Sequence, residues 1–545
     1  MPQYDKSMNR QIFASYPSRK LLREEFWLDF LCFSGLFLAA ALLFLVNLDS
    51  LPLRDWDEGI IAQVAKEIYQ APPDSHRWIF PTLWGEFYFN KPPLLHNLIA
   101  LFYSLGGVNE SMSRLPGALL TASSVPLLYA LGREIFPYRR PAIFSALVYL
   151  TLLPVVRHGR LAMLDGTILF LEILLFWTVL RSRRDLRWTL GVGFSLGLIF
   201  LTKGMLAVLL GAIAFLFLLW DTPRILSSFY LWIGLLLGSL PALAWYSAQF
   251  YFYGTVFAEH NLQSQFLERI YSEKEGNTGP IWYYFLEIVK YSLPYFVFFL
   301  AGLRLSWENR NWSWAKFILV WSFCYFVIVS LMVTKLPWYI LPIYPALALA
   351  AGVKLDQLYN LPEFSNYSRL WKILFSFIAF IASFGAIYFA VFTNNPEEQF
   401  LAIICLAIAL TMGTVAILLI KRQRQFIAVL FWGMYISLLL FVNSSLWNWE
   451  LNEAYQVKPV AEMIREAQVL ESASIYTSFP YERPSLNFYS NHRIIPVEIE
   501  ELSYLWSNAD SIYLLIDSES KQELSLTDAK LVAQVDDWLL IRKNN

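Results

Sequence analysis

The sequence predicts a polytopic α-helical membrane protein that ends in a small α/β domain. Of its 545 residues, 57% are hydrophobic and only 16% are charged, which is too apolar for soluble domains of ordinary size. Apolar runs of roughly 20 residues, enough to cross a ~30 Å hydrocarbon core, recur along the chain. After Phe441 the composition becomes that of an ordinary soluble protein, with short β-rich runs.

Charge and cysteine content exclude two functional classes. The net charge is -1, from 42 Lys+Arg against 43 Asp+Glu, so the chain is not a nucleic-acid binder that works by bulk neutralisation of phosphates. The three cysteines, Cys32, Cys324 and Cys405, each lie inside an apolar run. They therefore supply neither a disulfide framework nor a zinc knuckle.

The first apolar run, Trp27–Val46, follows a basic leader and is too long for a signal peptide, so we expect a retained anchor with a cytoplasmic N-terminus. Twelve further runs give thirteen predicted spans. They lie near 115–136, 141–155, 166–180, 188–200, 204–220, 226–248, 281–303, 314–333, 337–352, 371–392, 400–420 and 426–446. The stretch Pro92–Gly107 is predicted to be a juxtamembrane helix, because making it a span would place three basic clusters outside, against the positive-inside rule.

This topology divides the chain into a membrane domain, residues 1–446, and a soluble extracytoplasmic domain, residues 447–545. The first outer loop covers about 49–114. In the C-terminal domain we expect a helix at Val457–Ala467 and a turn at Asp536-Asp537. The expected strands are Ala473–Phe479, Arg493–Ile499, Ser511–Ile516, Lys530–Val535 and Trp538–Ile541.

The first outer loop carries an acidic cluster that is a candidate catalytic site. Asp57 and Glu58 begin a segment whose apolar residues recur at helical spacing up to Ile68, which predicts an amphipathic helix lying on the bilayer. One interpretation is that these two acids merely cap the helix, because acids are favoured in a first turn. However, a carboxylate held against an apolar boundary can have the raised pKa that suits a general base.

Several cations are predicted to face the same outer compartment as these acids. Lys91 precedes the two prolines that begin the juxtamembrane helix, where it either snorkels towards headgroups or meets a lipid phosphate. The other cations in outer loops or at outer span ends are Arg54, Arg157, Arg160, Lys203 and Lys335, and together with Lys91 they could bind an anion. The candidates to bind a phosphate are Lys91, Arg160, Lys203 and Lys335. Asp165 enters the next span, where an unpaired charge is costly and usually functional.

The order of these motifs resembles the polytopic GT-C glycosyltransferases, which include protein O-mannosyltransferases and the bacterial aminoarabinose transferase acting on lipid A. The matching segments are Trp56–Gly59, Gly85–Leu95, Val108–Glu110 with Arg114–Pro116, Gly159–Asp165, Leu201–Gly204 and Lys335–Tyr339. They cover about residues 50–350, and their combination is more specific than any single motif.

The resemblance implies the roles of individual residues. Asp57, with its neighbour Glu58, and Asp165 would be the catalytic acids, and Lys91 would meet the donor phosphate. The motif aromatics Tyr88, Trp338 and Tyr339 are expected to line the substrate cavity. His260 is placed near a metal-ligating histidine of the aminoarabinose transferase, which makes a divalent metal ion a candidate cofactor. Two departures are Asn90, where that relative has Glu, and Ile60, where it has Arg.

The resemblance also implies an inverting transfer of a sugar from a polyprenyl-phosphate donor to a lipid, glycan or protein acceptor at the outer face of a bacterial inner membrane. The residues support such chemistry independently of the family. Nucleotide sugars are absent outside the cytoplasm, so a transferase there needs a membrane-borne donor, a carboxylate base and fixed positive charge for the leaving phosphate. The alternatives are a lipid or glycan transporter and a catalytically silent assembly partner.

Overall fold

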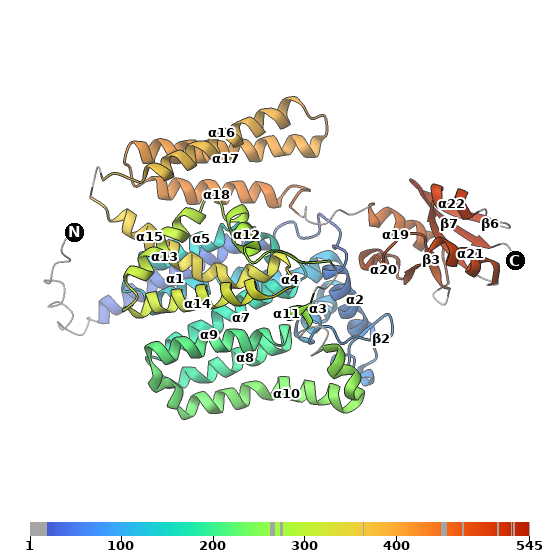
Figure 1. The fold of residues 1–545 in the computed structure, drawn as a ribbon, viewed down its shortest axis with the longest axis horizontal. Helices are drawn as coiled ribbons and strands as arrows, with labels where there is room; N and C mark the ends of the chain where they lie inside the picture. Colours follow the sequence, from blue (N-terminus) through green and yellow to red (C-terminus); the bar gives the residue numbers. More distant parts are fainter. Residues whose placement is uncertain are drawn as a thin grey trace.

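The computed structural model contains a bundle of long helices with a C-terminal α/β region at one end (Figure 1). It describes residues 19–261, 268–272, 276–362, 365–447, 455–470, 473–508, 512–524, 526 and 529–543. The basic leader before residue 19 and part of the loop 249–280 therefore lie outside the described residues. A single apolar cluster runs through the bundle, and the C-terminal region has apolar clusters of its own.

Every predicted span coincides with a helix or with a pair of consecutive helices. Eleven of the spans coincide with one helix each: α1 (Arg19–Leu45), α4 (Glu110–Ile135), α7 (Leu164–Arg181), α8 (Thr189–Lys203), α9 (Leu206–Asp221), α10 (Phe229–Ala258), α14 (Ser313–Leu331), α15 (Tyr344–Tyr359), α16 (Arg369–Val391), α17 (Pro396–Ile420) and α18 (Phe426–Val442). Helix α10 is kinked at Gly254, beyond the predicted span 226–248. Within the described residues, seven helices are individually long and apolar enough to span a membrane, or nine if each bent pair forms one span. The remaining predicted spans are shorter or, like α7, carry three charged residues.

Two runs that were predicted as single spans are broken. The run 141–155 forms α5 (Arg139–Leu150) and α6 (Leu153–Gly159), which meet at 62°. Pro154, in the first turn of α6, has no amide hydrogen to continue the preceding helix. The run 281–303 forms α12 (Tyr283–Tyr291) and α13 (Phe296–Glu308), bent by 119° next to Pro294. The first break directs residues 157–165 across the end of the bundle.

The first outer loop forms a compact layer over that end of the bundle. It contains α2 (Asp57–Gln70), the short strands β1 (Thr82–Leu83) and β2 (Glu86–Phe87), and α3 (Leu94–Gly106). With 13 residues, α3 is about 20 Å long and too short to cross a bilayer, as predicted for Pro92–Gly107. The prediction that α2 lies on the bilayer is wrong. Its apolar face, including Ile61 and Ala65, is buried against α3 inside the protein.

The C-terminal region is a five-stranded sheet with helices, and all five expected strands are present. They are β3 (Ile475–Thr477), β4 (Ile494–Pro496), β5 (Tyr513–Asp517), β6 (Ala529–Val535) and β7 (Trp538–Lys543), in the order β4-β3-β5-β7-β6. β3 pairs in parallel with β4 and β5, and β7 is antiparallel to β5 and β6. Its helices are α19 (Val457–Glu466), α20 (Pro484–Ser490), α21 (Ile499–Asn508) and α22 (Ser518–Leu524). Helix α20 packs directly on α2.

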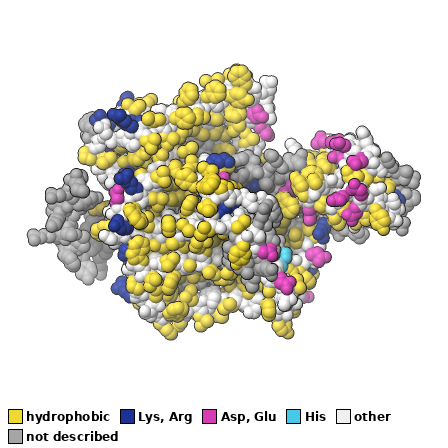
Figure 2. Space-filling view, viewed as in Figure 1, with side chains coloured by type: hydrophobic (Ala, Val, Ile, Leu, Met, Phe, Trp, Pro, Cys, Tyr) yellow, Lys and Arg dark blue, Asp and Glu magenta, His cyan; other side chains and the backbone are white. Residues whose placement is uncertain are grey.

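The surface of the bundle has the distribution expected of a membrane protein. Hydrophobic side chains cover the flank of the helices, and Lys and Arg gather at the end away from the C-terminal region (Figure 2). At that end, Arg133 and Arg139 form ion pairs with Asp29 of α1. Arg181 and Arg184 pair there with Glu134 of α4. The chain is therefore a multi-pass membrane protein with one strongly basic end.

Candidate active site

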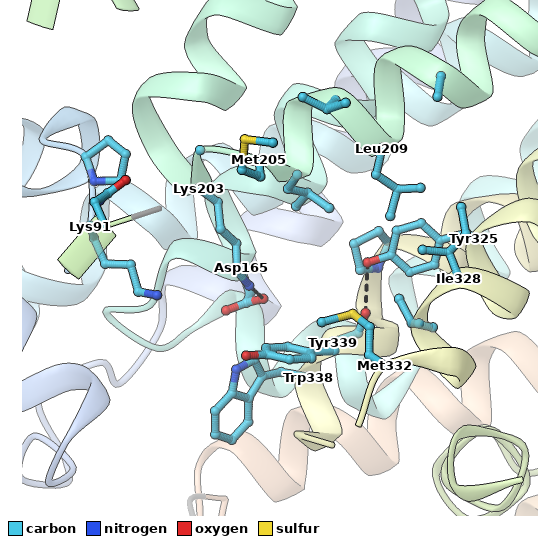
Figure 3. Close-up of a pocket in the computed structure, with 18 of the residues that line it drawn as sticks. Lys91, Asp165, Lys203, Met205, Leu209, Tyr325, Ile328, Met332, Trp338 and Tyr339 are labelled. Atoms are coloured by element: carbon cyan, nitrogen blue, oxygen red, sulfur yellow. Dashed lines mark hydrogen bonds and ion pairs between the residues drawn. The ribbon is translucent and has the colours of Figure 1, made fainter. Parts of the chain in front are cut away.

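A cavity of about 530 Å³ lies at the end of the bundle beneath the first outer loop (Figure 3). Its polar part is lined by Asn90, Lys91, Asp165, Lys203 and Asn261. Its apolar part lies between α9 and α14. The apolar lining consists of Met205, Leu206, Val208, Leu209, Ala212, Ile328, Val329, Leu331 and Met332. Among these, Val208, Ile328 and Leu331 are exposed on the surface of the bundle, so the apolar part reaches the side that faces lipid.

The polar part is organised by an ion pair between two of the predicted residues. Asp165 lies in the first turn of α7, where the helix dipole favours a carboxylate. Lys203, the last residue of α8, places its Nζ 2.7 Å from Oδ1 of Asp165. The same ammonium lies 5.5 Å from the ring centre of Tyr339. The structure thus brings together a carboxylate, a cation and an aromatic face that are far apart in the sequence.

The turn after Lys203 depends on a glycine. Gly204 has φ +50°, a conformation that L residues rarely adopt, and it joins α8 to α9 at the cavity wall. A Cβ at this position would also lie 3.0 Å from the hydroxyl of Tyr246. Gly204 therefore lets α8 end with Lys203 at the cavity while α9 returns along its apolar side.

Asp57, in the first turn of α2, lies close to this polar cluster but is not among the lining residues. Burial raises the pKa of Asp57 to about 6. The nearby positive charge of Arg54 lowers this pKa, and the negative charge of Asp165 raises it. The positive charges of Lys91 and Lys203 lower it further. Among the described residues, no hydrogen bond or ion pair to its carboxylate is found. Such a carboxylate can accept a proton near neutral pH.

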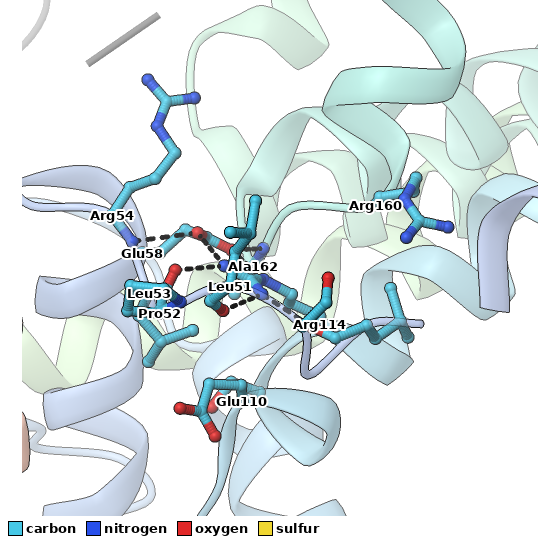
Figure 4. Close-up of polar contacts among 12 residues, drawn as sticks. Leu51, Pro52, Leu53, Arg54, Glu58, Glu110, Arg114, Arg160 and Ala162 are labelled. Carbon is cyan, nitrogen blue, oxygen red and sulfur yellow. Dashed lines mark hydrogen bonds and ion pairs between the residues drawn. The ribbon is translucent and has the colours of Figure 1, made fainter. Parts of the chain in front are cut away.

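Glu58 occupies a different environment from its neighbour Asp57 (Figure 4). It is fully buried and accepts hydrogen bonds of 2.8 Å from both Nε and Nη2 of Arg114. It also accepts hydrogen bonds from the backbone N–H groups of Arg54 and Ala162. Although burial raises its pKa, the Arg114 guanidinium brings the pKa of Glu58 below its usual value. Glu58 was predicted to be catalytic, but its oxygens are occupied by contacts that join the first and second outer loops.

Two of the four predicted phosphate-binding cations lie outside the cavity lining. Arg160 is fully buried and donates to the carbonyl oxygens of Leu43 and Asn47 near the end of α1. Lys335 donates to the carbonyls of residues 329, 330 and 332 at the C-terminal end of α14. Both side chains therefore satisfy carbonyl groups that a helix end leaves without partners. Lys91 and Lys203 are the two predicted cations that line the cavity.

The predicted aromatic residues are divided in the same way. Trp338 and Tyr339, which begin the segment Pro337–Ile343 before α15, line the cavity. Tyr88 is buried outside it, with its ring edge-on to that of His96. Burial and the nearby charge of Asp57 both raise the pKa of Tyr88. Tyr88 thus packs beside Asp57 instead of facing the cavity.

The predicted metal ligand His260 is exposed and hydrogen-bonds to the side chain of Asn90 through its Nε2. In the described part of the chain, no group of three His, Cys, Asp or Glu residues is arranged to hold a metal ion. An imidazole and an amide oxygen alone form a poor ligand set for a divalent cation. The residues that the structure describes around His260 therefore do not fit the metal site that the resemblance implied.

Arg54 is one of the cations that the sequence places on the same side as the acidic cluster. Its side chain is buried and points away from the Glu58–Arg114 pair (Figure 4). Neither Nε nor Nη1 has a hydrogen-bond partner among the described residues. A buried cation with unused donors beside Asp57 needs a negative partner. The sequence signal was its place next to the acidic cluster, but snorkelling cations look the same in a sequence.

Comparison with solved structures identifies the fold as that of the GT-C glycosyltransferases. ArnT from Cupriavidus metallidurans bound to undecaprenyl phosphate superimposes with a TM-score of 0.75 at 20% identity, over 94% of this chain and 98% of that one. The archaeal oligosaccharyltransferase AglB from Archaeoglobus fulgidus, in complex with an inhibitory peptide and a dolichol-phosphate, gives a TM-score of 0.55 at 12% identity, over 92% and 71%. The chain is thus a membrane protein of the GT-C fold, as predicted.

By sequence, the chain is similar to bacterial arabinosyl transferases. It is 31% identical over 328 residues to undecaprenyl phosphate-alpha-4-amino-4-deoxy-L-arabinose arabinosyl transferase 1 of Pseudomonas fluorescens, covering 58% of each chain. It is also 31% identical over 341 residues to the transferase of the same description from Pseudomonas aeruginosa, covering 59% of each. The match thus spans a little under three fifths of the length of these relatives. The family model for dolichyl-phosphate-mannose-protein mannosyltransferases matches residues 90–246. The predicted resemblance is confirmed.

Proposed function

We propose that this protein is an inverting glycosyltransferase that moves a sugar from a polyprenyl-phosphate donor to an acceptor at the outer face of a bacterial inner membrane. The observation that carries the proposal is the composition of the cavity. Two cations and a carboxylate line one part of it, and the other part is apolar and reaches the lipid-facing side between α9 and α14. A polyprenyl phosphate has the same division into an anionic head and an apolar chain.

The cations of the polar part are assigned to the phosphate. Lys203 and Lys91 both line the cavity, and Lys203 is held there by Asp165. As the bond between the sugar and the phosphate breaks, negative charge grows on the phosphate oxygen, and fixed cations stabilise that charge. The buried guanidinium of Arg54 adds positive charge beside Asp57.

Asp57 is assigned the role of general base. The acceptor hydroxyl or amine gives its proton to the Asp57 carboxylate while its heteroatom forms a bond to the anomeric carbon. The electron pair of the broken carbon–oxygen bond leaves with the phosphate. A single base is sufficient for inversion. Asp165 is less suited to this task because Lys203 pairs with it at 2.7 Å, so it orients the cation.

The distribution of charge supports the proposed orientation in the membrane. Arg133 and Arg181 lie in the last turns of α4 and α7, and the cavity residue Asp165 lies in the first turn of α7. Lys and Arg gather at the end of the bundle away from the C-terminal region (Figure 2). Because Lys and Arg remain in the cytoplasm during insertion, we infer that the cavity opens outside. Membrane-borne donors are available in that compartment, and nucleotide sugars are not.

The relatives suggest which donor to test first. They are described as undecaprenyl phosphate-alpha-4-amino-4-deoxy-L-arabinose arabinosyl transferases, and we propose an undecaprenyl-phosphate-linked sugar as the donor here. The acceptor is proposed to be an outer-face lipid or glycan, since the cavity is reached from the membrane.

The experiment is a transfer assay with the purified full-length protein in phospholipid vesicles. A panel of undecaprenyl-phosphate sugars, beginning with 4-amino-4-deoxy-L-arabinose, is offered with lipid and glycan acceptors, and new glycosidic products are detected by mass spectrometry. We expect Asp57→Asn to abolish transfer while binding of undecaprenyl phosphate persists. Asp74→Asn, the same change at an exposed acid of the same loop, serves as the control and should retain transfer.

Two outcomes would overturn the proposal. Undiminished transfer by Asp57→Asn would reject the assignment of the base. Movement of the lipid-linked sugar across the bilayer without any new glycosidic bond, in the original protein and in Asp57→Asn alike, would show a transporter.

A further inference from the structure

The loop that carries Asp57 is held by the C-terminal region. Asp55, two residues before Asp57, is buried where α2 meets α20. Its Oδ2 accepts a hydrogen bond of 2.7 Å from Nε of Arg483, and its Oδ1 accepts one of 3.0 Å from the backbone N–H of Ser485. The hydroxyl of Ser485 donates to the same oxygen. One carboxylate of the membrane part is therefore bound by three donors of the C-terminal region.

Arg483 is held in place by contacts within the C-terminal region as well as by Asp55. Its Nη1 donates to the backbone carbonyl of Tyr455 at 3.0 Å, and its guanidinium lies 4.1 Å from the centre of the Tyr455 ring. The ring of Phe479 contacts it from 5.8 Å. A planar guanidinium held between a carbonyl and aromatic rings is a rigid partner for a carboxylate.

The backbone transmits this anchor to Asp57. The N–H of Asp57 donates to the carbonyl of Asp55 at 2.8 Å, which closes a tight turn around Trp56. Trp56 has φ +63°, a strained conformation for a residue with a side chain, and such strain persists only where the surroundings impose it. Gly59 lies so close to α20 that a Cβ there would be 2.7 Å from the N atom of Ser485.

We propose that Arg483 and Ser485 are positioning residues, through which the C-terminal region sets the place of the general base Asp57. Neither residue lines the cavity, so they act through Asp55 and the turn, without touching the substrate. This inference rests on the proposed function. It gives the C-terminal region an indirect part in catalysis, through the position of Asp57.

The interface offers a matched control at the other end of α20. Lys66 of α2 donates from its Nζ to the carbonyl of Phe488 at 3.1 Å, and it also contacts Asn491. Lys66 thus contacts the C-terminal region at a place remote from the turn at Trp56. Removing its ammonium weakens the contact between the two parts of the chain without changing the environment of Asp55.

The test compares Arg483→Met, Arg483→Lys, Ser485→Ala and Lys66→Met in the full-length protein reconstituted in vesicles. We expect Arg483→Met to lower kcat at least tenfold with the KM for the lipid-linked donor changed less than threefold, and to alter the acid limb of the pH profile. Arg483→Lys should restore part of kcat, because an ammonium still pairs with Asp55. Lys66→Met should stay within twofold of the original kcat.

Hydrogen exchange of the amides of residues 55–59 provides a readout that does not depend on transfer. We expect exchange there to rise in Arg483→Met and to remain unchanged in Lys66→Met, even if the original protein transfers no sugar, in which case only the proposed function fails. If Arg483→Met does not fold, kcat and hydrogen exchange are measured in Ser485→Ala and Arg483→Lys instead. The inference would be overturned if the folded Arg483 and Ser485 variants had the same hydrogen exchange at residues 55–59 and the same kcat as the unsubstituted protein.

Discussion

Glu58→Gln is predicted to destabilise the protein strongly, whereas the same chemical change at the adjacent Asp57 is predicted to spare stability. Each oxygen of Glu58 accepts one hydrogen bond from Arg114 and one from a backbone N–H. Glutamine keeps one accepting oxygen but turns an NH₂ group towards the other two donors. Two hydrogen bonds to a charged group are lost, at about 1.5–3 kcal/mol each. The sum, about 3–6 kcal/mol, overlaps the usual cost of breaking a buried ion pair, about 3–5 kcal/mol.

The assay is unfolding of the purified protein in mixed detergent micelles at fixed temperature, with Asp57→Asn measured in parallel. The Asp57 carboxylate has no hydrogen bond among the described residues, and burial raises its pKa, so the ionised group costs stability at neutral pH. Asp57→Asn should therefore leave the free energy of unfolding unchanged or increase it. Asp57→Asn should instead lower the rate of sugar transfer, about 10²- to 10⁴-fold, because it removes the general base. A Glu58→Gln protein as stable as the original, with transfer lost as in Asp57→Asn, would refute this reasoning and make Glu58 catalytic.

Three further predictions concern the cavity. Burial raises the pKa of Asp57 to about 6. Because the base must be ionised to accept a proton, kcat/KM for transfer should rise with pH from 5 to 7 around that value; a profile flat down to pH 4.5 would contradict this. Lys203→Met should weaken binding of undecaprenyl phosphate at least tenfold, as measured by native mass spectrometry, since it removes a cavity cation and leaves Asp165 without its partner. Leu209→Trp, which fills the apolar part, should weaken the same binding with little change in the unfolding temperature; unchanged affinity would show that the prenyl chain lies elsewhere.

The helices and strands were largely predictable from local patterns. Hydrophobic runs of sufficient length located the helices of the bundle, because a lipid-embedded backbone must satisfy its hydrogen bonds within each segment. Short β-rich runs located the strands β3 to β7 of the C-terminal region. The breaks near residues 151 and 293 were missed, because a run of apolar residues reports burial and length but not direction.

The site was predictable in part. Asp165 and Lys203, which belong to separate motifs, do meet at the cavity. Arg160 and Lys335 carry the same charge as Lys203 but bind carbonyls near helix ends. A cation in an outer loop can meet a ligand, a headgroup or a helix terminus, and the sequence is the same in all three cases.

By itself, the sequence determined the class of this protein, because hydropathy and charge depend on residues one at a time or in short runs. It also determined that acids and cations gather in the loops of one side. Only the tertiary structure decided the use of each charge. Asp57 and Glu58 are neighbours in the chain, yet helix α2 turns them to different surroundings: one beside the cavity, and the other into Arg114. Burial and partners, which long-range packing creates, set the chemistry of a carboxylate.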